Sequence, residues 1–149
     1  AHGGNIDKFL GDGILATFGA VLPTENYAAD AMRTVDDLLD AADAWNADRA
    51  AVGRPPISIG MAIVTGRVVV GAVGDDTRLE YTVIGDPVNL CAKLEKHNRT
   101  ARTRALTTYD AVDLAMRQGY VPPAVRERRE AVSIDGVAAG VDLVVLAKR

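Results

Sequence analysis

The sequence predicts a single α+β domain, with helices packed against a largely antiparallel sheet. Two observations predict this class. Short runs rich in isoleucine and valine are bounded by glycine or aspartate, which is typical of strands and hairpins. Between them lie stretches with apolar residues at three- and four-residue spacing, which is typical of amphipathic helices. The expected order is hairpin, helix, hairpin, strand, helix, strand, helix and hairpin.

The first element should be a hairpin. Two apolar-rich runs, residues 6–10 and 14–18, flank the sequence Gly11-Asp12-Gly13. Glycine and aspartate tolerate the positive φ angles of tight turns, so this sequence predicts a turn with Asp12 at the hairpin tip.

A long amphipathic helix should follow over residues 24–52, where alanine, leucine, valine and methionine recur at helical spacing. Thr24 is typical of a helix N-cap, because its hydroxyl can accept from a free backbone amide of the first turn. Gly53, which stands just before two prolines, is typical of a helix end.

The second half predicts shorter elements. Residues 57–73 are rich in isoleucine, valine and glycine, and Thr65-Gly66 should fold this stretch into a second hairpin, with Asp75-Asp76 at the next turn. The remaining elements should be a strand over residues 80–84, a helix over 88–95 beginning at Pro87, a strand over 105–107, a helix over 109–118 ending at Gly119, and a terminal hairpin over 132–147.

Composition and charge exclude several functional classes. The 149 residues are 48% hydrophobic, enough for one domain over residues 1–149. Their 17 basic and 20 acidic side chains give a net charge of −3, so we expect no nucleic-acid partner. The single cysteine, Cys91, cannot form an internal disulfide. No signal peptide or bilayer-spanning run is apparent, so we expect a cytoplasmic domain without a membrane segment, or the cytoplasmic part of a larger signalling protein.

Two segments carry candidate functional residues. The segment KFLGDG, residues 8–13, places the Asp12 carboxylate on a glycine-flanked turn, where a metal-bound phosphate can approach, although Asp-Gly is also the commonest hairpin chemistry. In EYTVIGDPVNLCAKLE, residues 80–95, Asn89 and Lys93 fall four residues apart and should share one helix face. By itself, such a pair is more often solvated than functional.

Together and in this order, the segments resemble the catalytic domain of the class III nucleotidyl cyclases, the adenylate and guanylate cyclases. KFLGDG, GMAIVTGRVVVGAVG and RLEYTVIGDPVNLCAKLE carry the resemblance, which extends over residues 3–146. It implies the ferredoxin-like palm fold of that family. The family's first strand, in a segment like F-x-D-I-x-G-F-T, does not occur here. We therefore expect a partial domain that begins one strand and the following helices too late.

The resemblance implies conversion of ATP to 3′,5′-cyclic AMP and pyrophosphate, with two Mg²⁺ or Mn²⁺ ions assisting attack of the ribose 3′-oxygen on the α-phosphorus. Asp12 matches one of the family's two metal-binding aspartates, and the other is expected upstream of Ala1. Lys8 and Thr82 match the base-reading positions. A lysine donor suits N1 of adenine, and a threonine hydroxyl can accept from the adenine amine, so ATP is favoured over GTP.

Three further positions follow from the resemblance. Asn89 matches the asparagine that orients the ribose. Lys93 stands where the family usually has an arginine that stabilises charge on the phosphates, and Asp135 stands where a triphosphate-binding lysine is typical. These two departures leave open a degenerate module that dimerises or holds nucleotide without turnover. A guanylate cyclase is the specificity alternative.

Family members act as head-to-tail dimers, so the resemblance implies a homodimer with composite sites. Asp12 of one protomer would meet the base-, ribose- and phosphate-binding set Lys8, Thr82, Asn89 and Lys93 of the other. We expect the isolated fragment to be inactive, and an upstream regulatory domain to be present in the full-length protein. Cys91 should be a small packed residue, and Arg126 to Arg128 should be solvated.

Overall fold

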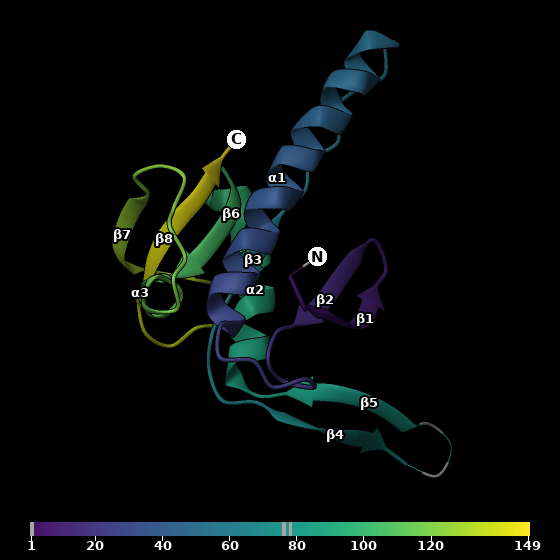
Figure 1. Ribbon diagram of the computed structural model, residues 1–149, viewed down its shortest axis with the longest axis vertical. Helices are drawn as coiled ribbons and strands as arrows, with labels where there is room; N and C mark the ends of the chain where they lie inside the picture. The colour runs from purple at the N-terminus through teal and green to yellow at the C-terminus, as the bar shows by residue number, and fades with distance from the viewer. Residues whose placement is uncertain (1, 76, 78) are drawn as a thin grey trace.

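A computed structural model describes residues 2–75, 77 and 79–149, and it confirms the α+β class. Its elements follow the order β1 (Asn5–Leu10), β2 (Gly13–Thr17), α1 (Tyr27–Ala51), β3 (Met61–Ile63), β4 (Val69–Gly74), β5 (Leu79–Ile84), α2 (Asp86–Ala101), β6 (Thr103–Thr108), α3 (Tyr109–Arg117), β7 (Glu127–Val132) and β8 (Val141–Lys148). A four-stranded sheet has the order β3-β6-β8-β7, and all its pairs are antiparallel except β3 with β6. The β1–β2 and β4–β5 pairs form two separate antiparallel hairpins beside this sheet (Figure 1).

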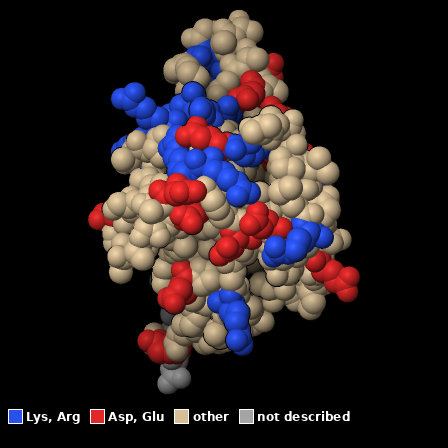
Figure 2. Space-filling model, turned by 90° about the vertical axis from the view of Figure 1, so that its left-hand side faces the viewer, with Lys and Arg blue, Asp and Glu red and all other residues tan. Residues whose placement is uncertain are grey.

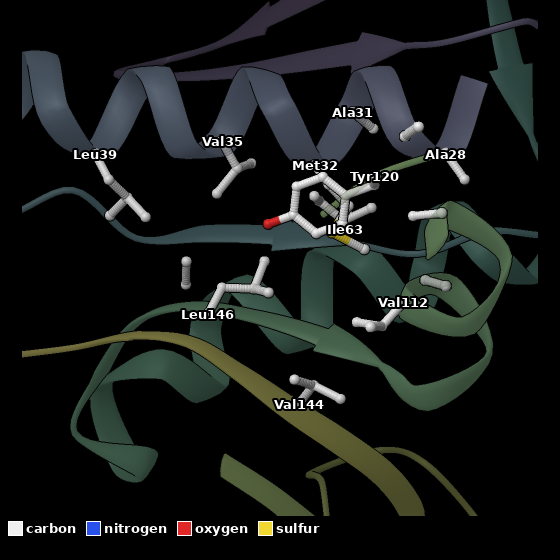
Figure 3. Packing of buried hydrophobic residues seen from close by; sticks show 14 residues of the cluster. Ala28, Ala31, Met32, Val35, Leu39, Ile63, Val112, Tyr120, Val144 and Leu146 are labelled. Atoms are coloured by element: carbon white, nitrogen blue, oxygen red, sulfur yellow. The ribbon is translucent and has the colours of Figure 1, made fainter. Parts of the chain in front are cut away.

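The four-stranded sheet lies between two helical layers because its central strands alternate their apolar side chains. On β8, Val144 and Leu146 pack into the cluster formed with α1 and α3, whereas Leu143 and Val145 pack with Leu94 of α2. Figure 3 shows the first cluster, in which Met32, Val35 and Leu39 of α1 lie over the sheet. The second half of α1 extends beyond this core (Figure 1), and Trp45 is exposed there.

The start of α1 differs from the prediction. The helix begins at Tyr27, and Thr24 does not cap it: its hydroxyl accepts from the amide of Asn26, at 3.3 Å, outside the helix. The first free amides of the helix, those of Ala28 and Ala29, instead donate to the side-chain carbonyl of Gln118, at 2.8 and 3.1 Å. The cap therefore comes from the end of α3, a partner 90 residues away that local sequence could not reveal.

The hairpin predicted at Thr65-Gly66 is wrong. β3 instead pairs in parallel with β6, and the Thr107 hydroxyl donates to the carbonyl of Ile63 at 2.9 Å. The chain then passes beneath the start of α2, where a Cβ on Gly66 would lie 2.4 Å from Cγ of Pro87. Only glycine allows this approach, so Gly66 is explained by the close contact of the chain with Pro87 and not by a turn. The hairpin forms one strand later, between β4 and β5.

The other predicted elements are largely confirmed. The β1–β2 hairpin turns at Gly11, which has a φ of +68°, and Gly119 follows α3 with a φ of +85°. The helix α2 continues six residues past its predicted end, to Ala101. The terminal hairpin starts earlier than predicted, with β7 at Glu127. The predicted turn residue Asp76 lies outside the described residues.

Acidic and basic side chains are interspersed on the face seen in Figure 2, which is the side of the molecule where the edge strand β7 lies. On β7, the Glu127 carboxylate accepts a hydrogen bond from Arg129 at 2.6 Å and forms an ion pair with Lys148 at 2.6 Å. Hydrogen bonds from these two cations lower the pKa of Glu127 to about 2, and the bond from Arg129 has the largest effect.

Arg126 is not solvated as predicted. Its side chain is 15% exposed and donates to a carboxylate oxygen of Asp36 on α1 at 2.8 Å and to the carbonyl of Leu146. The other oxygen of Asp36 accepts from the hydroxyl of the buried Tyr120 at 2.7 Å. Burial and this bond raise the pKa of Tyr120 to about 12. The cluster ties α1 to the segment that precedes β7 and to β8.

We expect Arg126→Met to lower the free energy of unfolding by about 2 kcal/mol, because Asp36 would keep a partly buried charge without its cation. Arg128→Met is the matched control, since Arg128 lies two residues away and pairs with Asp113 on the surface. It should cost about 1 kcal/mol or less. Urea denaturation measures both, and equal losses in the two variants would contradict the account.

Candidate functional site

The candidate site is built on an irregular stretch of β1. Ile6 lies opposite Ala16 and Lys8 lies opposite Leu15, so Asp7 is an extra residue in the β1–β2 ladder. Such a bulge changes the aim of neighbouring side chains, which would otherwise alternate between the two faces. Here it lets consecutive residues, Asp7 and Lys8, both reach the side chains of β5.

These contacts join β1 to β5 through polar groups. The Thr82 hydroxyl donates to Oδ2 of Asp7 at 2.7 Å. The Lys8 ammonium lies 3.8 Å from the same carboxylate oxygen and 3.4 Å from Oε2 of Glu80. The Asp7 side chain is 6% exposed and Thr82 is 5% exposed, whereas the Lys8 side chain is 31% exposed. The structure thus brings Lys8 and Thr82 together, with a buried carboxylate between them.

Strand β5 leads directly into α2 through Gly85, whose φ of +148° is a conformation that a side chain disfavours. The carbonyl of Gly85 accepts the amides of Val88 and Asn89, at 3.1 and 3.3 Å, and so begins the helix. Asn89 is exposed, and Lys93 follows one helical turn later. Asn89 and Lys93 therefore lie on the helix that continues from the strand of Thr82.

Lys93 has a defined partner. Its ammonium donates to the carbonyl of Gly136, in the loop between β7 and β8. Asp135, the residue before, is exposed. Because an ammonium has three donors, Lys93 keeps hydrogen-bonding capacity for a phosphate oxygen, but the loop that holds it also carries a carboxylate.

Asp12 stands apart from the other four residues. It lies at the tip of the β1–β2 hairpin, which projects away from α2 in Figure 1. It is exposed and makes no hydrogen bond or ion pair with the residues that the structure describes. Its carboxylate is a hard oxygen donor that fits one position around Mg²⁺. Across residues 2–75, 77 and 79–149, no group of three or more His, Cys, Asp or Glu side chains could hold a metal ion.

Sequence reasoning missed two residues of this arrangement. Glu80 precedes Thr82 by two positions on β5, so strand alternation could have placed it on the same face, within reach of Lys8. Asp7 had no such signal, because alternation would have put it on the face opposite Lys8. Only the bulge brings both residues to β5.

Cys91 is a packed thiol, as the sequence predicted. It donates to the carbonyl of Ala62 at 3.4 Å, and burial raises its pKa to about 11. Because the thiolate is the reactive form, this cysteine is unsuited to nucleophilic chemistry near neutral pH.

Sequence comparison finds relatives over about three quarters of the chain. Adenylate cyclase 1 of Rhizobium meliloti is 35% identical over 108 residues, which are 72% of this chain and 16% of that protein. An uncharacterised protein of Mycobacterium tuberculosis is 39% identical over 114 residues, which are 76% of this chain and 20% of that protein. The chain thus spans a fifth or less of the length of these curated relatives. It matches no family model.

Solved structures are similar over nearly the whole chain. The adenylyl cyclase CyaB of P. aeruginosa is 28% identical, with a TM-score of 0.78, over 99% of this chain and 74% of that one. The guanylyl cyclase Cya2 is 30% identical, with a TM-score of 0.77, over 99% of this chain and 72% of that one.

None of the helices within the described residues is long and apolar enough to cross a membrane.

We expect Cys91 to react slowly with a thiol reagent at pH 8, because the thiol stays protonated until the pH approaches its raised pKa of about 11. Titration with a chromogenic disulfide in native buffer and in 6 M guanidinium measures the contrast. Reaction should be complete within the mixing time only after unfolding. Rapid reaction of the native chain would show that the thiol is neither packed nor protonated.

Proposed function

The chain belongs to the class III nucleotidyl cyclases, and from that premise we propose that it forms most of an adenylate cyclase catalytic domain. The observation that carries the proposal is the convergence of Lys8 and Thr82 at β5, next to the helix that bears Asn89 and Lys93. A donor and an acceptor for the base thus stand beside groups suited to ribose and phosphate.

The base would be read by hydrogen-bond polarity. The Lys8 ammonium can contact Asp7 and Glu80 and still donate to N1 of adenine, since it has three donors. The Thr82 hydroxyl has lone pairs left to accept from the adenine 6-amine. Guanine presents a donor at N1 and an acceptor at position 6, so the same pair of residues opposes it.

The sugar and phosphates would lie along α2. The exposed Asn89 amide would hold the ribose, and Lys93 would donate to phosphate oxygens while charge builds up on them. In the reaction, the ribose 3′-hydroxyl loses its proton to water, its oxygen forms a bond to the α-phosphorus, and pyrophosphate leaves as its bond to that phosphorus breaks. Lys93 is already oriented by the Gly136 carbonyl, which limits the freedom it would lose on binding.

Asp12 would act in a composite site as one ligand of Mg²⁺ or Mn²⁺. Divalent ions bound there would stabilise the negative charge of the attacking and leaving oxygens. Asp12 is suited to this because it is exposed and carries no competing ion pair within the described part of the chain. The remaining ligands would have to come from phosphate, water or another segment, because the described residues contain no cluster of three candidate ligands.

A homodimer would bring Asp12 of one copy to the α2 residues of the other. Large exposed apolar side chains on the two hairpins support such a contact, among them Phe9 and Ile14 on the first and Leu79 and Tyr81 on the second. We also propose that a further strand completes the domain. Within the described residues, β2 and β3 each pair on one side only, which leaves backbone groups free for a strand beside them.

A degenerate nucleotide-binding module is the second candidate. The contact of Lys93 with the loop that carries Asp135 favours this candidate. A triphosphate bound at Lys93 would lie near that loop, and the Asp135 carboxylate would repel the triphosphate. Turnover separates the two candidates, whereas binding alone does not.

We expect the longest natural form of the protein, with Mn²⁺, to convert ATP to cyclic AMP faster than GTP to cyclic GMP. Chromatographic detection of both products from equal substrate concentrations measures the preference. A dimer that binds ATP but releases no cyclic AMP would support the degenerate module, and a preference for GTP would support a guanylate cyclase.

Lys93→Met should lower kcat by about 100-fold, because a charge that stabilises the transition state is lost. Lys93→Arg should retain most of the activity. Lys96→Met is the matched control, since Lys96 is an exposed cation on the same helix, and it should leave kcat unchanged. If Lys93→Met were as active as Lys96→Met, Lys93 would have no part in the reaction.

A further inference from the structure

We propose that Asp7 sets the base preference of the site by fixing the direction of the Thr82 hydroxyl; this inference rests on the proposed function. Asp7 contacts no substrate position itself and acts through Thr82 as a positioning residue. Three observations support the role: the bulge that places Asp7, its burial, and the 2.7 Å hydrogen bond from Thr82.

The bulge shows that Asp7 is directed toward β5 by the fold. In a regular ladder, Asp7 and Lys8 would point to opposite faces of the hairpin. The register shift between Ile6 and Lys8 instead lets both side chains meet the Glu80–Thr82 face of β5. Bulges often serve to re-aim a side chain near a functional site.

The hydrogen bond restricts what Thr82 can do toward a ligand. A hydroxyl has one proton and two lone pairs, and a carboxylate only accepts. Because the Thr82 proton is donated to Asp7, the hydroxyl can present only its lone pairs to a base. The 6-amino group of adenine would donate to these lone pairs. The 6-oxo group of guanine has only lone pairs of its own, so no hydrogen would lie between the two oxygens. The discrimination against guanine therefore needs Asp7 as well as Thr82.

Burial makes this direction stable. The Asp7 side chain is 6% exposed, so little water competes with the Thr82 hydroxyl for the carboxylate oxygen. The Lys8 ammonium, 3.8 Å from the same carboxylate, adds a favourable charge interaction that helps to hold Asp7 in place. If Asp7 were replaced by a residue without a carboxylate, the Thr82 hydroxyl could rotate and donate toward a 6-oxo group.

The test measures the dissociation constants of the full chain for ATP and for GTP by calorimetry in the presence of Mg²⁺. Two variants change Asp7. Asp7→Ala removes the acceptor, and Asp7→Asn supplies an amide that can donate to the Thr82 hydroxyl as well as accept from it, so neither fixes the hydroxyl direction. The other variants are Thr82→Val and the double variant Asp7→Asn/Thr82→Val. Asp48→Asn is the matched control, since Asp48 is an exposed aspartate on the projecting half of α1. Thermal melting establishes that each variant is folded.

We expect the wild-type chain to bind ATP more tightly than GTP. Each folded Asp7 variant should lower the ratio of the two affinities by about tenfold, the worth of one hydrogen bond. Thr82→Val should lower it to a similar extent, and the double variant should lower it no further, because Asp7 acts only through the hydroxyl that Thr82→Val already removes. Asp48→Asn should leave the ratio unchanged.

An Asp7 variant that weakens ATP and GTP binding by the same factor, and so keeps the wild-type ratio, would overturn the inference and leave Asp7 a packing role only. Additive effects in the double variant would also overturn it, because Asp7 would then act independently of Thr82. If the wild-type chain binds neither nucleotide, the proposed function fails and this inference fails with it.

Discussion

The hydrogen bond between the Thr82 hydroxyl and the Asp7 carboxylate is the interaction on which the geometry of the candidate site depends. The β1–β2 and β4–β5 hairpins are separate sheets, and neither pairs with the four-stranded sheet within the described residues. Their polar contact at Asp7, Lys8 and Glu80 therefore positions one hairpin against the other. Both partners of the central bond are buried, so breaking it would leave polar groups without water to replace it.

The other half of the site is held by the core. Leu94 anchors α2 in the apolar cluster beneath the sheet, and Asn98 joins the end of the helix to two strands. Its amide donates to the carbonyl of Met61 at 2.8 Å, and its carbonyl accepts from the Thr103 hydroxyl at 2.8 Å. A helix that is anchored in the core and bears Asn89 and Lys93 thus meets a hairpin held by polar contacts. On the proposed function, base recognition would fall to Lys8 and Thr82, which lie outside the two apolar clusters of the core.

Local patterns predicted the parts of the fold that depend on neighbouring residues. Apolar spacing predicted α1, and the glycines around Asp12 predicted its hairpin tip. The N-cap of α1 and the environment of Arg126 were predicted wrongly, because Gln118 and Asp36, the partners that decide them, are distant in sequence. The candidate site divides in the same way. Motif resemblance supplied Lys8 and Thr82, but Asp7 depends on a one-residue bulge that no periodicity reveals.

The central claim is that one face of this chain, from the Lys8–Thr82 pair to the first turns of α2, receives the base, ribose and phosphates of ATP. The most direct test is chemical-shift mapping of the isotope-labelled chain with a non-hydrolysable ATP analogue. We expect saturable shifts of the backbone amides of Lys8, Thr82 and Asn89, with little change around Tyr120, which packs with α1 and α3 on the face of the sheet opposite α2. Shifts confined to the region of Tyr120, or none at saturating analogue, would contradict it.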